Sequence, residues 1–212
     1  MALPIFDGFP GILGDPLSAN WTVDVGSIII NASAQAVGNT TNHNFARWTG
    51  DTFPNDQYVE CNCYMSVNQA SGPTARHAAT GGGEGYNLTL YDDGSGARAY
   101  LQRFASGGAS FTAIATGPLG TSGQVNRMEL TGTSIEAKIN GTSMGVFTDA
   151  TYASGTVGLD FYQPSFADNF AAGGMKSATL GGTSAGGLTE ADVVAGGKTI
   201  TITLSGDTWI GA

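Results

Sequence analysis

Tyrosines alternate with planar polar side chains along several neighbouring stretches of this 212-residue sequence. Sugars are bound by aromatic platforms together with planar polar groups that fix the positions of hydroxyls. A glycan-binding face is therefore one interpretation of the side chains on the non-core faces of these stretches, which are Tyr58, Glu60, Asn62, Tyr64, Arg76, Asn87, Tyr91, Arg98, Tyr100 and Gln102. The alternative is a solvated or subunit-packed sheet face, on which tyrosine and threonine occur because they favour strands.

The two histidines, His43 and His77, are the only imidazoles that could serve as a general base. A serine nucleophile needs such a base in a fixed position beside it. His77 lies in the alanine-rich segment TARHAAT, and this setting favours a packed strand residue over a catalytic base.

Cys61 and Cys63 are the only cysteines, and they lie two positions apart in one expected strand. Their side chains point to the same face, where a disulfide between them would be strained. Two reduced core thiols are expected, because a metal or redox pair would need histidine or further cysteine nearby.

The elements that must position these residues are short strands that end at glycine. Residues 57–67, QYVECNCYMSV, alternate apolar and polar side chains, as a half-buried strand requires. Val59, Cys61, Cys63, Met65 and Val67 are expected on the core face. The strands predicted in this way are 21–25, 27–32, 44–49, 57–67, 74–79, 85–91, 97–104, 109–116, 124–131, 134–139, 143–148, 155–162, 166–170 and 174–180.

The breaks between these strands carry turn-forming residues, and Asn140-Gly141 is the strongest hairpin signal. Around this hairpin, the side chains expected to face the core are Met128, Leu130, Ile135, Ala137 and Ile139. Many short strands without an amphipathic helix predict an all-β, antiparallel two-sheet sandwich or jelly roll.

Charge and hydropathy exclude several function classes. Lysine and arginine total 8 against 17 aspartates and glutamates, a formal net charge of −9. Nucleic-acid binding needs a basic stripe, so neither a nucleic-acid partner nor an anionic membrane surface is expected. No apolar run approaches the roughly 18 residues of a membrane span. The opening MALPIFDGFPGILG lacks a basic segment, so no signal peptide is expected.

The composition changes at residues 181–187, GGTSAGG, which is typical of a flexible linker. A sandwich is therefore expected over 1–180 and an extension over 188–212. The extension is too short to form a core of its own. It is expected to act as an assembly arm, or to fold back on its own sandwich, through apolar side chains that include Ile200, Ile202, Leu204 and Trp209.

Several segments together resemble the concanavalin A-like, laminin-G-like lectin and glucanase superfamily over about residues 1–180. They are Phe6-Asp7-Gly8-Phe9 before Trp21, the stretch from Arg76 to Tyr86 followed by NLTLYDD, the hairpin MELTGTSIEAKINGTSMGVFTD, and the ending TYASGTVGLDFYQPSFADNF. The resemblance implies a jelly roll whose first and last strands pair antiparallel. The segment GLTEADVVAGGKTITITLSGDTW resembles a C-terminal segment of bacteriophage virion proteins and related bacterial surface proteins.

The resemblance also implies two kinds of site. Some superfamily members bind calcium between the N-terminal loop and the last strand, and Asp7 and Asp168 lie in the matching segments. The alternative is that Asp168 is a turn or hydrogen-bonding residue. Superfamily hydrolases carry carboxylates at alternate positions of one strand, roughly 5 Å apart in a retaining enzyme. That spacing is absent here, because Glu129 and Glu136 lie on different strands and Glu60 stands alone.

The function expected from the sequence is therefore binding and not catalysis. A lectin-like domain without a signal peptide favours a bacteriophage virion protein made in the host cytoplasm. It would act as a capsid decoration or cement protein, or as a head or tail adhesin. Its expected partners are other virion subunits, further copies of itself and a polysaccharide, with no cofactor required unless calcium binds. The alternatives are a carbohydrate-binding module of a bacterial protein, exported without a signal peptide, and an unusual glycoside hydrolase.

Overall fold

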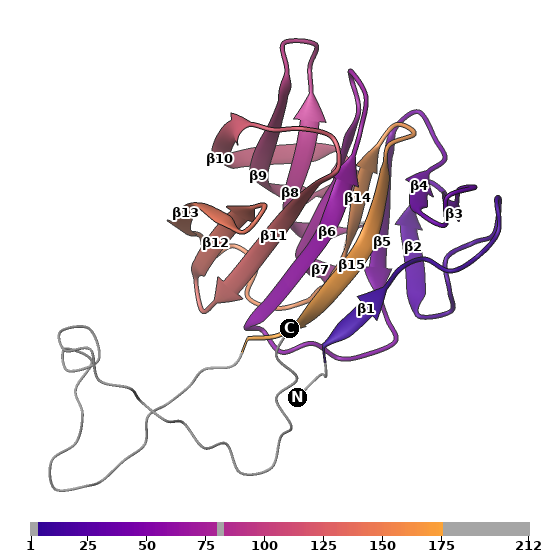
Figure 1. Cartoon of the computed structure of the whole chain (residues 1–212). Coiled ribbons are helices and arrows are strands. Elements are labelled where there is room, and N and C mark those ends of the chain that lie inside the picture. The colour runs from indigo at the N-terminus through magenta and orange to yellow at the C-terminus, as the bar shows by residue number, and fades with distance from the viewer. Residues whose placement is uncertain (1–3, 80–82, 176–212) are drawn as a thin grey trace, which may run out of the picture. The chain divides into compact units, whose positions relative to one another are not determined.

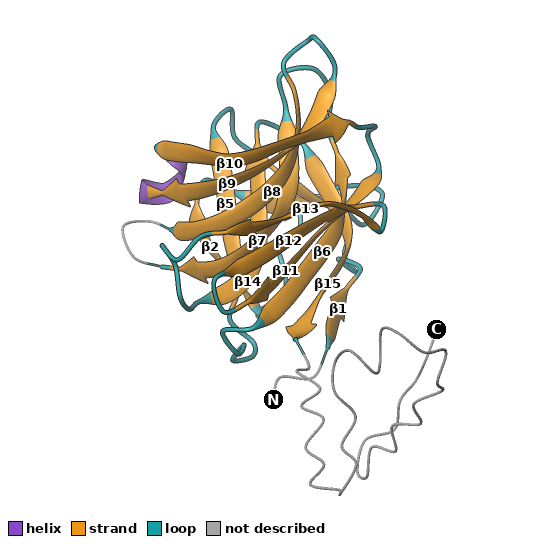
Figure 2. Cartoon of the chain, turned by 90° about the vertical axis from the view of Figure 1, so that its left-hand side faces the viewer, coloured by secondary structure: helices purple, strands orange, loops and turns teal. Residues whose placement is uncertain are grey.

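The computed structural model describes residues 4–79 and 83–175, which form two antiparallel sheets packed face to face (Figure 1, Figure 2). The strands of the first sheet are, in spatial order, β13 (Thr142–Thr148), β12 (Ser134–Ile139), β11 (Gln124–Thr131), β6 (Gln57–Tyr64), β15 (Phe166–Gly174), β4 (Ala36–Gly38) and β3 (Ile28–Ile30), with β1 (Ile5–Asp7) also beside β15. The strands of the second sheet are β10 (Ser110–Leu119), β9 (Ala97–Ala105), β8 (Glu84–Asp92), β7 (Ala70–Ala78), β14 (Thr156–Tyr162), β5 (His43–Trp48) and β2 (Trp21–Val25).

The predicted all-β sandwich is confirmed, and so is the pairing of its first and last strands. β1 and β15 run antiparallel with Ile5 opposite Ala172. Figure 1 shows them side by side at the lower end of the first sheet. The tail predictions, including the strand at 174–180 beyond Met175 and the division at 181–187, lie outside the described residues.

The core lies between the sheets and follows the predicted alternation. Val59, Cys61 and Cys63 of β6 are fully buried, and the two cysteines are free thiols. The strand ends at Tyr64, however, so Met65 is only partly buried and the side chain of Val67 is 56% exposed. The prediction that Val67 faces the core is therefore wrong.

The predicted β12–β13 hairpin is also confirmed. Asn140 and Gly141 connect the two strands with φ values of 48° and 77°, as a tight hairpin turn with two left-handed residues requires. The residues predicted to face inward are fully buried at Met128, Leu130, Ile135 and Ala137, and Ile139 packs partly buried against them. The register of this part of the first sheet was therefore predictable from period-two alternation.

The strand predicted at 74–79 begins four residues earlier, at Ala70. The missed segment is Ala70-Ser71-Gly72-Pro73, whose serine, glycine and proline are typical of turns. Tertiary pairing overrides that local preference, because β7 lies between β8 and β14 in the middle of the second sheet. This strand also forms the candidate site described next.

Candidate functional site

The outer face of the second sheet carries a regular grid of side chains. One row across the strands contains Arg98, Tyr91, Ala70, Tyr162 and His43. The next row contains Tyr100, Thr89, Gly72, Asp160 and Phe45. Bulky side chains therefore flank β7, which presents small ones.

The small residues of β7 create a hollow in the middle of this face. Ala70 and Gly72 stand where the neighbouring strands carry Tyr91, Tyr162 and Asp160. A Cβ atom on Gly72 would collide with the backbone of Leu88, so the close approach of β7 and β8 requires glycine there.

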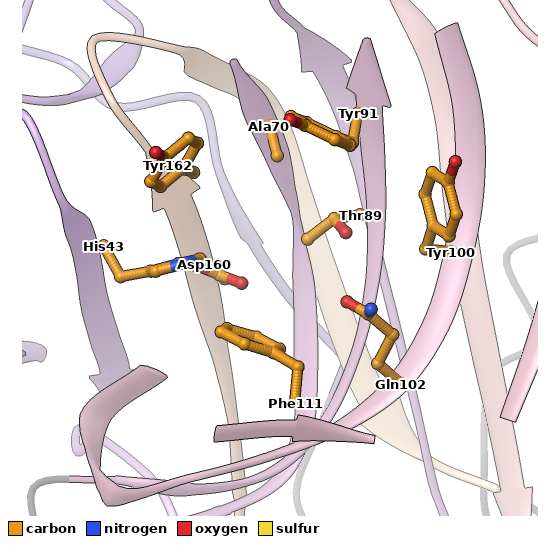
Figure 3. A pocket seen from close by; sticks show the side chains of 9 residues that line it. All are labelled: His43, Ala70, Thr89, Tyr91, Tyr100, Gln102, Phe111, Asp160 and Tyr162. Atoms are coloured by element: carbon orange, nitrogen blue, oxygen red, sulfur yellow. The ribbon is translucent and has the colours of Figure 1, made fainter. Parts of the chain in front are cut away.

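A pocket of about 450 Å³ occupies this hollow (Figure 3). That volume lies within the range of small-molecule sites. The side chains that line it come from six strands, and edge strand β10 supplies Phe111 (Figure 3). The lining residues are His43, Ala70, Thr89, Tyr91, Tyr100, Gln102, Phe111, Asp160 and Tyr162.

Five rings surround the pocket in a continuous series of contacts. The ring centroid of His43 lies 4.6 Å from that of Phe111 and 4.9 Å from that of Tyr162. The Tyr91 centroid lies 6.4 Å from that of Tyr162 and 6.1 Å from that of Tyr100. We call these five residues the aromatic rim. Its rings offer apolar faces, and its tyrosines also offer hydroxyl groups.

The floor of the pocket is polar and centres on Asp160, whose side chain is only 1% exposed. One carboxylate oxygen lies 3.0 Å from Nδ1 of His43. The other accepts a hydrogen bond of 2.7 Å from Nδ2 of Asn87. These two contacts fix the carboxylate in place, and each of its oxygens keeps a lone pair for a ligand donor.

Burial raises the pKa of Tyr91, and the nearby Tyr162 and Asp93 act in the same direction. The phenol of Tyr91 therefore stays protonated at neutral pH and can donate a hydrogen bond as well as accept one.

A second polar cluster is buried further along the same face. Nε of Arg47 donates to Asp24 at 2.9 Å, and Nε2 of His77 lies 3.5 Å from the other Asp24 oxygen. Burial, reinforced by the positive charge of Arg47, lowers the pKa of His77 to about 3. His77 is therefore neutral, and its contact with Asp24 is not an ion pair. Burial also raises the pKa of Asp24, although the hydrogen bond from Arg47 opposes this shift.

The structure divides the residues predicted to bind glycan between the two sheets. Tyr91, Tyr100 and Gln102 come together in the pocket. Asn87 is buried beside them and holds Asp160, and Arg98 lies on the same face outside the pocket lining. The alternation of β8 and β9 was therefore sufficient to find one side of this site.

The predicted residues of β6 lie on the outer face of the first sheet and contact side chains of neighbouring strands. The Arg127 guanidinium lies 4.2 Å above the Tyr58 ring and 3.0 Å from a Glu60 oxygen. The ring of Tyr64 stacks on that of Phe166 at 4.9 Å. The remaining member, Asn62, donates to the carbonyl of Gly123 and accepts from Asn169. The described structure does not bring these four residues into the pocket.

Arg76 is a buried structural residue, so its prediction as a surface ligand is wrong. Its side chain is 2% exposed and donates to the backbone carbonyls of Asn55, Gly132 and Tyr152. Its φ of 46° coincides with an irregularity in the pairing of β7 and β8, where the strand alternation breaks. Alternation along the strand therefore predicted an exposed side chain at Arg76, where the structure has a buried one. The same irregular segment buries His77, which confirms the prediction of a packed strand residue.

Most of the other lining residues, above all His43 and Asp160, were not predicted from the sequence to bind a ligand. Asp160 carries the clearest overlooked signal, because a lone carboxylate interrupts the apolar strand TVGLDFY. His43 precedes the predicted strand by one residue and occupies its outward-facing register. Phe111 and Tyr162 had no comparable signal, since aromatic residues are ordinary in strands.

Asp7 and Asp168 do not share ligands in this structure. Both Asp7 oxygens accept hydrogen bonds, one from the backbone of Phe9 and one from the Trp21 indole, at 2.7 and 2.8 Å. Asp168 is partly exposed and accepts from the amide of Asn169. Within residues 4–79 and 83–175, no group of three or more histidine, cysteine, aspartate or glutamate side chains could hold a metal ion. The shared calcium remains a prediction that this geometry does not favour.

The glutamates of β6, β11 and β12 are engaged in ion pairs. Glu129 and Glu136 lie directly opposite each other on β11 and β12, and Lys138 contacts them at 2.8 and 3.3 Å. Arg127 pairs with Glu129 at 2.6 Å. These contacts join the two glutamates in a charged surface network on the outer face of the sheet.

Comparison with known proteins establishes the fold class. No family model matches the chain, and no curated protein matches it significantly. A carbohydrate-binding module of family 66 from Bacillus subtilis has 14% identity and a TM-score of 0.61, covering 73% of this chain and 95% of that one. A β-glucanase from Bacillus licheniformis has 8% identity and a TM-score of 0.54, covering 82% and 98%. The carbohydrate recognition domain of Emp47p has 11% identity and a TM-score of 0.51, covering 77% and 95%.

At these identities the likeness shows the fold alone, a concanavalin A-like sandwich shared by carbohydrate-binding modules, lectins and glucanases. None of the described residues forms a helix long and apolar enough to cross a membrane.

Proposed function

We propose that the pocket on the outer face of the second sheet binds carbohydrate, and that the protein acts as a lectin-like or carbohydrate-binding module. The observation that carries this proposal is the aromatic rim around a polar floor. The fold is compatible with this role, because solved carbohydrate-binding modules and lectin domains share it.

In this proposal the rim and the floor contribute differently. The rings of Tyr91, Tyr162 and Phe111 pack against the C–H groups of a sugar ring and remove apolar surface from water. The Asp160 carboxylate accepts hydrogen bonds from sugar hydroxyls, and Gln102 can both donate and accept. Because neighbouring side chains already hold Asp160, little ordering cost remains for binding.

We also propose that the site does not catalyse hydrolysis. Asp160 is the one carboxylate among the residues that line the pocket in the described structure. Glycoside hydrolysis ordinarily uses two carboxyl groups on opposite sides of the bond that is cleaved. Release of reducing ends from any bound polysaccharide, lost in an Asp160→Asn variant, would contradict this part of the proposal.

The virion role expected from the sequence stays an untested prediction. It rests on the expected lack of a signal peptide and on the resemblance of the C-terminal segment, which lies outside the described structure. The protein matches that establish the fold do not bear on it.

A glycan array followed by calorimetric titration of the strongest ligand tests the binding site. Tyr162→Ala should weaken binding at least about tenfold, because it removes one ring of the rim. Tyr58→Ala is the matched control, since Tyr58 is a partly exposed tyrosine on the outer face of the other sheet. Equal losses in the two variants, or a loss only in Tyr58→Ala, would refute the proposed site.

A further inference from the structure

We propose that the pocket selects a protonated primary amine, carried by an amino sugar, over the corresponding neutral or N-acetylated sugar. This inference rests on the proposed function and specifies the chemical class of its ligand. It depends on the charge of the floor, the chemistry of the rim and the positions of the arginines on the same face.

The floor offers more hydrogen-bond acceptors than donors. Asp160 is almost fully buried, and an imidazole with its proton on Nδ1 would satisfy the His43 contact without bringing a second charge. Its other partner, the Asn87 amide, is uncharged, and Oδ1 of Asn87 is buried without a hydrogen-bond partner in the described structure. A ligand that brings several donors and a positive charge would satisfy the Asp160 carboxylate better than a hydroxyl group.

The rim is suited to the same group. Tyr91, Tyr100, Phe111 and Tyr162 bring aromatic rings to the pocket that contains the carboxylate (Figure 3). The negative faces of aromatic rings attract cations, and amine recognition by aromatic cages uses this attraction. A carboxylate within an aromatic rim therefore provides both the charge and the surroundings that an ammonium group requires.

The arginines of this face do not compensate the charge of the floor. Arg47 lies one row from Asp160 but pairs with Asp24 at 2.9 Å. Arg98 lies opposite Tyr91 and is not among the lining residues. Neither lysine nor arginine lines the pocket within the described residues. Sugars that carry a carboxylate or sulfate would therefore meet an unfavourable field.

Three trisaccharides with the same β-1,4 backbone separate these possibilities by calorimetric titration, at a pH where the ligand amine is protonated. They are the glucosamine trimer, the N-acetylglucosamine trimer and cellotriose, which differ in an amine, an acetamide or a hydroxyl at one carbon of each unit. The glucosamine trimer should bind at least about tenfold more tightly than the other two, as expected for a charge-assisted hydrogen bond.

Two variants distinguish recognition in the pocket from general attraction to an acidic protein. Asp160→Asn should bring the affinity for the glucosamine trimer close to that for the other two trimers, because it removes the charge of the floor while keeping the size of the side chain. Glu84→Gln makes the same change in net charge on the same sheet, at a residue outside the pocket lining, and it should keep the preference. Phe111→Leu, which removes a rim residue on an edge strand, should also weaken binding of the glucosamine trimer and decides the question if Asp160→Asn fails to fold.

Each outcome bears on the inference. A preference that survives in folded Asp160→Asn, or that disappears equally in Glu84→Gln, would overturn it in favour of non-specific attraction. Equal or tighter binding of the N-acetylated or neutral trimer would also overturn it and leave the proposed carbohydrate site intact. Failure of all three trimers to bind would refute the amine preference, and the glycan array would then decide separately whether the protein binds other carbohydrates.

Discussion

His77 should make the folded protein sensitive to acid. Its side chain is 1% exposed and lies among Phe45, Phe104 and Thr74, whose hydroxyl is 3.1 Å from Nδ1. A positive charge in this setting would be poorly solvated and would lie near the Arg47 guanidinium. Folding therefore holds the imidazole neutral at pH values at which the unfolded chain protonates it.

The size of the effect follows from the difference between the two pKa values of His77. Folding lowers this pKa from 6.5 to about 3. Above pH 6.5 the residue is neutral in both states and stability does not depend on it. Below that pH the unfolded state binds a proton that the folded state does not, so the free energy of unfolding falls by about 1.4 kcal/mol per pH unit. Between about pH 7.5 and about pH 4.5 the expected loss from this residue is about 2.7 kcal/mol.

Urea unfolding of the wild type and a His77→Gln variant at these two pH values measures the effect. The substitution costs some stability at both, but the pH-dependent loss should be smaller in the variant by about 2–3 kcal/mol. Titrations of groups that lie away from His77 are common to both proteins and cancel in this difference. The same pH dependence in both proteins, or an NMR titration that gives His77 a pKa near 6.5 in the folded state, would refute the argument.

Three further predictions concern the core, the predicted calcium ion and the C-terminal extension. Leu130→Ala should lower the free energy of unfolding, measured with urea, by roughly 2–5 kcal/mol. Val146→Ala, at a side chain that is 65% exposed, should lower it by under about 0.5 kcal/mol. Similar losses in the two variants would show that the assigned strand register is wrong. Asp7→Asn should lower the free energy of unfolding by about 1–3 kcal/mol, because it disrupts the hydrogen bond from the Trp21 indole. Chelators should leave the melting temperature of the wild type unchanged. A melting temperature that falls with chelator would support the calcium site instead. Deletion of 184–212 should leave the sandwich folded and abolish self-association or particle binding, as measured by sedimentation; full assembly of the truncated protein would contradict the anchoring role.

Part of the site was predictable, because it depends on alternation along single strands. Tyr91, Tyr100 and Gln102 occupy the outward positions of β8 and β9 that their spacing predicts. Arg76 was misassigned because the strand is irregular at that position, and a local irregularity has no period-two signature.

The amino-acid sequence by itself determined the antiparallel sandwich, the β12–β13 hairpin and the core face of β6. These features depend on local alternation and turn chemistry, which one segment contains in full. Only the tertiary structure decided that Asp160 and Asn87, far apart in the sequence, meet at the floor of one pocket. It also decided that Ala70 and Gly72 belong to a central strand, since the pairing partners that override their turn preference lie elsewhere in the chain. Strand order creates the hollow and its rim, and strand order depends on contacts between distant segments.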